Sequence, residues 1–175
     1  MRLFIALQFT DEIKNRLQEA IETLKAGSMQ GNFTRRENLH LTVVFIGETT
    51  QANEIITAIN KVSVKPFPLK IGGLGRFRRD GGDIYWVGVE KSRELSQIYS
   101  LLYSELTEAG FRLENREYKP HLTLGREIIP AKSFERTSFD RSVGTMEMCV
   151  PAISLMKSER INAKLVYTEI YRKAL

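Results

Sequence analysis

The sequence predicts an α+β fold in which antiparallel sheets carry helices on their outer faces. Extended and helical segments follow one another in a non-alternating order, which is typical of antiparallel rather than parallel sheets. Hydrophobic residues make up 42% of the 175 residues, enough for one hydrophobic core. The two halves of the chain also repeat one order of elements: a helix, a basic loop, and a strand that begins with His-Leu-Thr.

This repeat indicates an internal duplication rather than a solenoid, because only two copies fit in the chain. We therefore expect a single domain over residues 1–175 with two pseudo-symmetric lobes. Each lobe carries one copy of the motif, at 40–43 and at 121–124.

The expected strands are short apolar or alternating runs bounded by glycine, proline or charged residues. They lie at 2–8, 39–46, 69–74, 84–89, 121–124, 146–156 and 165–171. We expect the last two to be antiparallel neighbours.

Three helices are expected from apolar residues that recur at helical spacing. The first follows Thr10, whose hydroxyl can cap the free N–H groups of the first turn, and ends at Gly27. The second covers about 51–62. The third begins after Ser92 and is closed by Gly110.

The remaining segments are expected to be loops, several of them basic. They cover 31–38, 76–83, 112–119 and 127–140, the last with at most a short helix. Their cations are candidates for contacts with an anionic partner, although solvated loop charge explains many of them equally well. The candidates are Arg35, Arg36, Arg76, Arg78, Arg79, Arg112, Arg116 and Lys119.

Composition narrows the class of protein. The net charge of +5 favours an anionic partner, such as a nucleic acid, a nucleotide or a phospholipid surface, or else a solvated basic surface. No apolar run approaches the ~20 residues that span a bilayer, so we expect no membrane partner. The single Cys149 excludes an internal disulfide, and we expect it to be a small buried side chain in a cytoplasmic protein.

The chain has only two histidines, and both begin the same tripeptide: His40-Leu41-Thr42 and His121-Leu122-Thr123. On a strand, alternate side chains point to opposite faces, so each histidine shares a face with the threonine two residues later. Two imidazoles can act as a general base and a general acid near neutral pH. Two hydroxyls can hold the non-bridging oxygens of a phosphate, so the set suits phosphodiester cleavage without a metal.

Other interpretations of the motifs stay open at this point. A histidine on a strand is often structural, although the repeat argues against this. A zinc site would need a third ligand, for which Cys149 or Glu127 is available but at no typical spacing. A nucleophilic serine triad, a P-loop and a dinucleotide fingerprint have no matching sequence. We expect neither a metal nor a cofactor.

With their flanking residues, the two motifs resemble the two-histidine (2H) phosphoesterase superfamily, and more closely its RNA 2′,3′-cyclic phosphodiesterases, also called 2′-5′ RNA ligases. The matching segments are 38–47 and 116–126, which includes Arg126. The first strand at 2–6 and the closing segments at 155–158 and 165–167 also resemble this family. One small departure is Val43-Val44, where the family often has a leucine after the first motif.

The resemblance implies a bilobal fold, with two antiparallel sheets that face each other across a central cleft under pseudo-twofold symmetry. It also implies hydrolysis of RNA 2′,3′-cyclic phosphate ends to a 2′-phosphate. His40 would be the proton donor to the departing 3′ oxygen, and His121 the proton acceptor that activates water. Thr42 and Thr123 would hold phosphate oxygens, with Arg126 as a further phosphate contact. The motifs themselves are near twins and do not establish which histidine is the acid.

The expected partner is therefore RNA, or an oligonucleotide, with a 2′,3′-cyclic phosphate end. Phe77 and Tyr118 lie among the basic loops and are candidates to stack on a base. We expect a monomer. Two alternatives remain: a 2′-5′ RNA ligase or other cyclic-phosphate phosphodiesterase with the same site, and a non-catalytic module that binds RNA ends.

Overall fold

The computed structural model describes residues 1–175 and contains nine strands and four α-helices. The strands are β1 (Arg2–Gln8), β2 (Ser28–Phe33), β3 (His40–Glu48), β4 (Phe67–Phe77), β5 (Asp83–Val89), β6 (His121–Pro130), β7 (Thr145–Val150), β8 (Ala152–Ile161) and β9 (Lys164–Ala174). The helices are α1 (Asp11–Ala26), α2 (Ala52–Asn60), α3 (Arg93–Glu108) and α4 (Arg136–Val143), and a 3-10 turn, η1, covers Arg36–Asn38.

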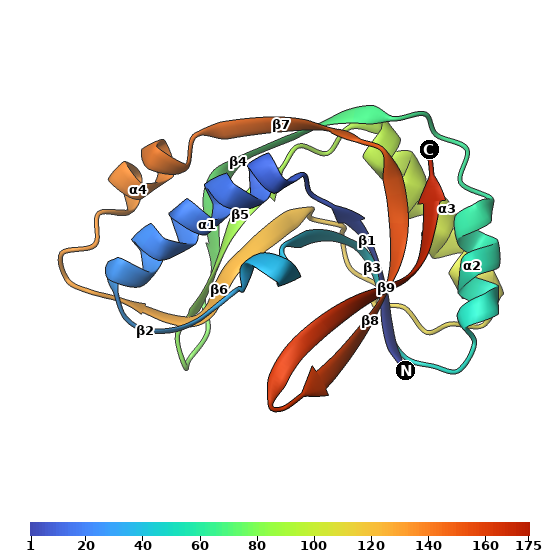
Figure 1. Ribbon diagram of the computed structural model, residues 1–175, viewed down its shortest axis with the longest axis horizontal. Helices are drawn as coiled ribbons and strands as arrows, with labels where there is room; N and C mark the ends of the chain where they lie inside the picture. The colour runs from blue at the N-terminus through green and yellow to red at the C-terminus, as the bar shows by residue number, and fades with distance from the viewer.

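The strands form two sheets, one in each lobe (Figure 1). The first has the order β3-β1-β8-β9 and the second the order β2-β6-β5-β4-β7. Every pair of neighbouring strands is antiparallel. The predicted α+β class is therefore confirmed, and so is the antiparallel pairing of the last two strands.

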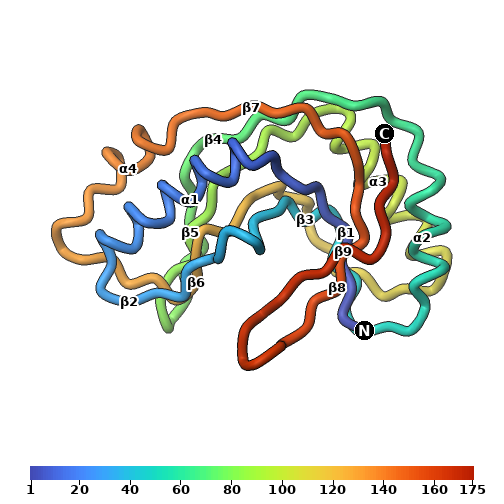
Figure 2. The backbone as a smooth tube through the Cα atoms, in the orientation of Figure 1, coloured from blue at the N-terminus to red at the C-terminus, as the bar shows by residue number.

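The helices are exchanged between the lobes. Helix α1 follows β1 of the first sheet, yet it packs with α4 against β2 and β6 of the second sheet. Helix α3 follows β5 of the second sheet, yet it packs with α2 over the first sheet and contacts β3. Each lobe is thus covered by a helix that follows a strand of the other lobe. The backbone can be followed through these two crossings in Figure 2.

A single hydrophobic cluster of 37 buried residues runs through both lobes. It includes the inward faces of α1 and α3, for example Leu17 and Leu102, and the apolar residues of both motif strands. Because the cluster is continuous, the lobes are held relative to each other by packing rather than by a linker. None of the helices has the length and hydropathy that crossing a bilayer requires.

Both predicted helix starts are confirmed by their caps. The Thr10 hydroxyl accepts a hydrogen bond from the N–H of Ile13, and the Ser92 hydroxyl accepts one from the N–H of Leu95. These bonds satisfy donors that have no partner within the helix. Helix α1 ends before Gly27, and α3 ends two residues before Gly110, whose φ is +89°.

The predicted loop at 31–38 is wrong in its first part, because β2 occupies Ser28–Phe33. None of the residues of this edge strand is buried, and it is held by backbone pairing with β6, which a side-chain pattern does not reveal. Strands β4 and β6 also continue past their predicted ends, to Phe77 and Pro130, through hydrogen bonds with their neighbours.

The predicted strand at 146–156 is in fact two strands in different sheets. Pro151 separates them, so that β7 pairs with β4 of the second sheet whereas β8 pairs with β1 of the first. Proline lacks the N–H that a continuous ladder would need. Cys149 is exposed rather than buried, because it lies between Met148 and Val150, which point into the core.

Candidate active site

His40 and His121 are the first residues of β3 and β6, equivalent strands in the two lobes. Leu41 and Leu122, next in the chain, are fully buried and anchor the strands in the core. Side chains alternate along a strand, so each histidine lies with its threonine on the face away from the core. Although β3 and β6 belong to different sheets, the two strands approach each other, and some Cα atoms of one lie within 8 Å of Cα atoms of the other.

The faces that carry the two motifs turn toward each other. Arg126 extends from β6 in one lobe, and Tyr167 lies on β9 in the other. Burial raises the pKa of the Tyr167 phenol, and the positive charges of Arg126 and Arg2 oppose this. The Tyr167 ring in turn contacts the His40 ring, with 5.1 Å between centroids. The charge of Arg126 on the second motif strand therefore acts on a side chain that packs against the first histidine.

The ring of His40 is held by hydrogen bonds and by two aromatic neighbours. Its Nδ1 lies 2.7 Å from the carbonyl oxygen of Asn38, so Nδ1 carries the proton and donates. In the neutral ring Nε2 is then an acceptor, and the Thr42 hydroxyl, 2.9 Å away, can donate to it. Phe4, 4.9 Å away between centroids, and Tyr167 pack against the ring.

These surroundings favour the neutral form of His40. Burial lowers its pKa from 6.5 to about 4, because an imidazolium loses hydration in this site. The Asn38 carbonyl opposes the change, and the positive charge of Lys14 on α1 adds to it. At neutral pH His40 is therefore an uncharged acceptor, ready to take a hydrogen bond through Nε2.

His121 is oriented in the same way but is more open. Its Nδ1 donates to the carbonyl oxygen of Lys119 at 2.6 Å, again the residue two positions earlier. No protein group hydrogen-bonds Nε2, which is left free to meet a ligand or water. The rings of Phe77 and Trp86 lie beside it, at centroid distances of 5.3 Å and 5.7 Å. Each histidine thus has a backbone carbonyl behind it and two aromatic rings at its side.

Trp86 is a residue of this site that the sequence did not indicate to us. It pairs with Thr123 across β5 and β6, and residues directly opposite each other share a face of the sheet. On its other side it lies over Gly75 of β4, where a Cβ atom would come 2.0 Å from the indole Cζ2. The alternation of Ile84, Trp86 and Gly88 is the signal that could have placed the indole on the motif face.

Tyr118, which precedes β6 of the second lobe, contacts β3 and α3 on the side of the first lobe. Its hydroxyl donates to the carbonyl oxygen of Thr42 at 3.2 Å, and its ring stacks on Tyr99 with 4.3 Å between centroids. Burial holds the pKa of the Tyr118 hydroxyl above its ordinary value, so it stays a neutral donor. Tyr99 already covers one face of the Tyr118 ring. The expected role of Tyr118 in base stacking stays a prediction.

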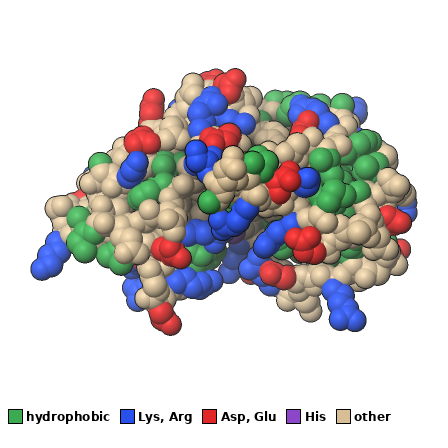
Figure 3. Space-filling model, turned by 60° about the horizontal axis from the view of Figure 1, so that its bottom comes forward, with side chains coloured by type: hydrophobic (Ala, Val, Ile, Leu, Met, Phe, Trp, Pro, Cys, Tyr) green, Lys and Arg blue, Asp and Glu red, His purple; other side chains and the backbone are tan.

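Several basic residues that the sequence singled out are engaged in structural contacts. Arg36 bonds to Asp11 and Asn15 of α1, and Arg76 to Asp83. Arg35, Arg116 and Lys119 pair with Glu37, Glu114 and Glu117. Arg126 is exposed and has no carboxylate partner. Figure 3 shows Lys and Arg side chains gathered around a hollow in the middle of the face turned forward there.

Comparisons with known proteins place these features in a family. Residues 11–161 match the model of the 2′-5′ RNA ligase superfamily. The chain belongs to this superfamily. A protein of Thermotoga maritima named RNA 2′,3′-cyclic phosphodiesterase is 29% identical, with 98% of this chain and 94% of that protein covered. One of the same name from Methanothermobacter thermautotrophicus is 30% identical, with 97% and 96% covered.

Solved structures agree with this assignment. The crystal structure of Escherichia coli LigT complexed with 3′-AMP has a TM-score of 0.79 and 27% identity. The similarity covers 99% of this chain and 97% of that one. This member of the 2′-5′ RNA ligase superfamily therefore shares its whole fold with a protein that binds a nucleotide.

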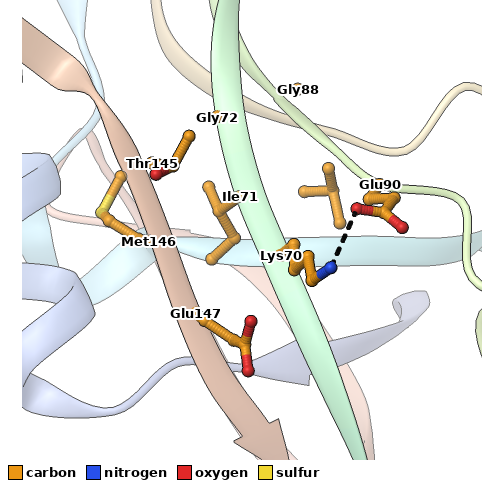
Figure 4. A pocket seen from close by; sticks show the side chains of 9 residues that line it. Lys70, Ile71, Gly72, Gly88, Glu90, Thr145, Met146 and Glu147 are labelled. Atoms are coloured by element: carbon orange, nitrogen blue, oxygen red, sulfur yellow. Dashed lines mark ion pairs between the residues drawn. The ribbon is translucent and has the colours of Figure 1, made fainter.

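A separate depression of about 570 Å³ lies on β4, β5 and β7 (Figure 4). The Nζ atom of Lys70 lies 3.8 Å from an Oε atom of Glu90 there, and Glu147 points into the same space. Two carboxylates against one amine give it a negative balance that repels phosphate.

No group of three or more His, Cys, Asp or Glu side chains in the protein is arranged to hold a metal ion. The zinc site that Cys149 or Glu127 would complete therefore has no set of ligands in the structure.

Proposed function

We propose that this protein hydrolyses the 2′,3′-cyclic phosphate end of RNA to a 2′-phosphate, by acid–base catalysis with His40 and His121 and without a metal. The observation that carries the proposal is the pair of equivalent motif strands, each presenting a backbone-oriented imidazole and a hydroxyl at the junction of the lobes. The relatives named RNA 2′,3′-cyclic phosphodiesterase support the choice of substrate.

His121 acts as the general base. Its Nδ1 proton is held by the Lys119 carbonyl, so Nε2 has a free lone pair for a water molecule. As the water oxygen bonds to phosphorus, its proton passes to Nε2. A positioned base of this kind contributes typically 10²–10⁴-fold to the rate.

His40 acts as the general acid. The bond between phosphorus and the 3′ oxygen breaks, and Nε2 gives its proton to that oxygen, which leaves a 2′-phosphate and a 3′-hydroxyl. Within the protein alone His40 is neutral at pH 7, because burial lowers its pKa to about 4. A bound phosphate supplies the negative charge that stabilises the imidazolium, so substrate binding itself protonates the acid.

Hydroxyl groups and one arginine hold the phosphate oxygens in this scheme. Thr42, whose hydroxyl lies within hydrogen-bond distance of His40, and Thr123 donate to the non-bridging oxygens as charge develops. Arg126 adds a positive charge from the second lobe. Phe77 and Trp86 provide an aromatic surface beside His121 on which the terminal base can stack.

Two experiments test the proposal. A cyclic-phosphate-ended oligonucleotide incubated with the enzyme in EDTA should give a 2′-phosphate, and His40→Ala and His121→Ala should each abolish most of the turnover. A substrate whose 3′ oxygen is replaced by sulfur then separates the two roles, because a thiolate leaves without a general acid. It should restore turnover to His40→Ala but not to His121→Ala. Rescue of His121→Ala instead would reverse the roles.

The same site can also run the related transfer, in which the 5′-hydroxyl of a second RNA replaces water and a 2′-5′ bond forms. The family's description, 2′-5′ RNA ligase superfamily, favours this as the second candidate. Added 5′-hydroxyl RNA would give a joined product. Tight binding of RNA ends without turnover would instead indicate the non-catalytic module. A cytoplasmic location and a monomeric state stay predictions.

A further inference from the structure

Strands β8 and β9 extend beyond the sheet to which they belong. β1 pairs with β8 only as far as Ser158, whereas β8 and β9 remain paired to Ile161 and Lys164. Residues 159–166, which we call the hairpin tip, therefore project as a two-stranded ribbon (Figures 1 and 2). Such a ribbon contributes little to the core, and it is joined to the rest of the protein at Leu165, whose carbonyl oxygen accepts hydrogen bonds from Arg35 and Asn38.

The hairpin tip ends in a tight two-residue turn. Asn162 and Ala163 have φ values of 50° and 62°. Two successive residues with positive φ are the mark of a type I′ turn, whose twist matches that of the strands it joins. The hairpin tip is thus a well-formed projection rather than an irregular loop.

One face of this ribbon continues the surface that surrounds His40. Tyr167, whose ring contacts His40, lies opposite Ser158. The pair two residues further along, Arg160 and Leu165, has the same orientation, because side chains alternate along a strand. Arg160 therefore lies roughly 7 Å beyond the Tyr167 position in the direction of the tip.

The charge of the hairpin tip is positive and not neutralised. Arg160 bonds only to the carbonyl oxygen of Ala163, and neither it nor Lys164 has a carboxylate partner. The one acidic residue of the hairpin tip, Glu159, is paired with Lys157 at 2.9 Å. On the face of Tyr167, whose phenol feels the charges of Arg2 and Arg126, Arg160 continues this positive charge onto the ribbon, and Lys164 lies beside the turn on the opposite face.

The chemistry of the hairpin tip fits a nucleic acid better than a protein. Ile161 and Leu165 are its exposed apolar side chains, at 48% and 36% exposure. Two such residues expose much less apolar surface than a stable protein interface needs, since such an interface buries about 1,200–2,000 Å² in total. Single-stranded RNA needs only cations along its backbone and apolar surface for its bases.

We propose that the hairpin tip binds the RNA nucleotides on the 5′ side of the cyclic phosphate, with Arg160 as a phosphate contact on the face of Tyr167 and Lys164 as one beside the turn, on the opposite face of the ribbon. This inference rests on the proposed function, and it specifies the substrate as a strand rather than a mononucleotide. The terminal nucleotide occupies the groove between the lobes, and the chain upstream follows the ribbon. The hairpin tip then determines preference for length without touching the reacting phosphate.

The double variant Arg160→Gln/Lys164→Gln tests this against a matched control. Each lost phosphate contact should weaken single-strand binding about 5-fold at about 0.1 M salt, because log K falls by about 0.7 per decade of salt for each contact. The double variant should therefore lose about 25-fold in kcat/KM for a cyclic-phosphate-ended oligonucleotide in the low-substrate regime. Its turnover of a 2′,3′-cyclic mononucleotide should stay at the wild-type level.

The control is Lys65→Gln/Lys91→Gln, which removes the same charge from the α2–β4 and β5–α3 connections, away from the hairpin tip. It should retain the wild-type ratio of oligonucleotide to mononucleotide turnover. If wild-type protein shows no preference for the oligonucleotide, or if both double variants behave alike, the inference is wrong.

Binding of a fluorescent 2′-phosphate-ended oligonucleotide, followed by anisotropy, keeps the inference separate from the proposed function. If the wild-type protein binds this RNA and Arg160→Gln/Lys164→Gln weakens that binding, but no cyclic phosphate is hydrolysed, only the proposed function is wrong. Normal hydrolysis with unchanged binding in the variant would overturn the role of the hairpin tip alone.

Discussion

The protonation of His40 is the property on which the mechanism can be tested most directly. Burial lowers its pKa from 6.5 to about 4, a difference of roughly 3 kcal/mol at 1.36 kcal/mol for each pKa unit. A unit negative charge about 4 Å from the ring stabilises the imidazolium form by about 4 kcal/mol at an effective dielectric constant near 20. Since this is equivalent to a rise in pKa of about 3, one bound anion restores the acid at neutral pH.

The assay is a pH titration of the histidine ring signals by NMR. The protein has two histidines, so the spectrum holds two such signals, and His121→Gln assigns them. We expect the His40 signal to titrate near pH 4 in the free protein and about 3 pH units higher with saturating sulfate, whose charge is constant over this range. Titration of His40 at its ordinary pKa without ligand, or no response to sulfate, would refute the reasoning.

The same pKa predicts a stability effect with a definite sign. Because the pKa of His40 is lower in the folded protein, the unfolded chain binds the proton more tightly. Neutral His40 makes its full contribution to the unfolding free energy above pH 6.5, and this contribution is lost as the pH falls toward 4. Between pH 7.5 and 4, wild-type protein should lose up to ~3 kcal/mol more unfolding free energy than His40→Asn, as measured with urea.

Three further substitutions test other parts of the structure. Gly75→Ala puts a methyl group where Trp86 lies, so it should cost about 1–3 kcal/mol in urea unfolding and reduce turnover, whereas unchanged kinetics would mean that Trp86 is not part of the site. Tyr118→Phe removes the hydroxyl that binds the Thr42 carbonyl, and should cost about 1 kcal/mol of unfolding free energy and lower kcat; loss of stability without any effect on kcat would limit the residue to packing. Ala163→Gly relieves a positive φ and should raise the unfolding free energy by about 0.5–1 kcal/mol, with cyclic mononucleotide turnover unchanged; destabilisation would contradict the turn geometry.

Local chemistry explains which structural expectations succeeded. The Thr10 and Ser92 caps were predictable, because a cap depends on a hydroxyl and the few residues that follow it. The split at Pro151 was not, because the residues on both sides are apolar and only the sheet pairing differs. Strand β2 was missed because its partner, β6, lies almost a hundred residues later in the chain.

The sequence alone determined which side chains can do chemistry here. Its only two histidines stand in identical tripeptides, and the alternation of a strand is a local property that places each beside its threonine. The tertiary structure decided how those groups differ. Burial by Phe4 and Tyr167 makes His40 neutral while Nε2 of His121 stays free, and this contrast depends on contacts between distant strands that no local pattern encodes.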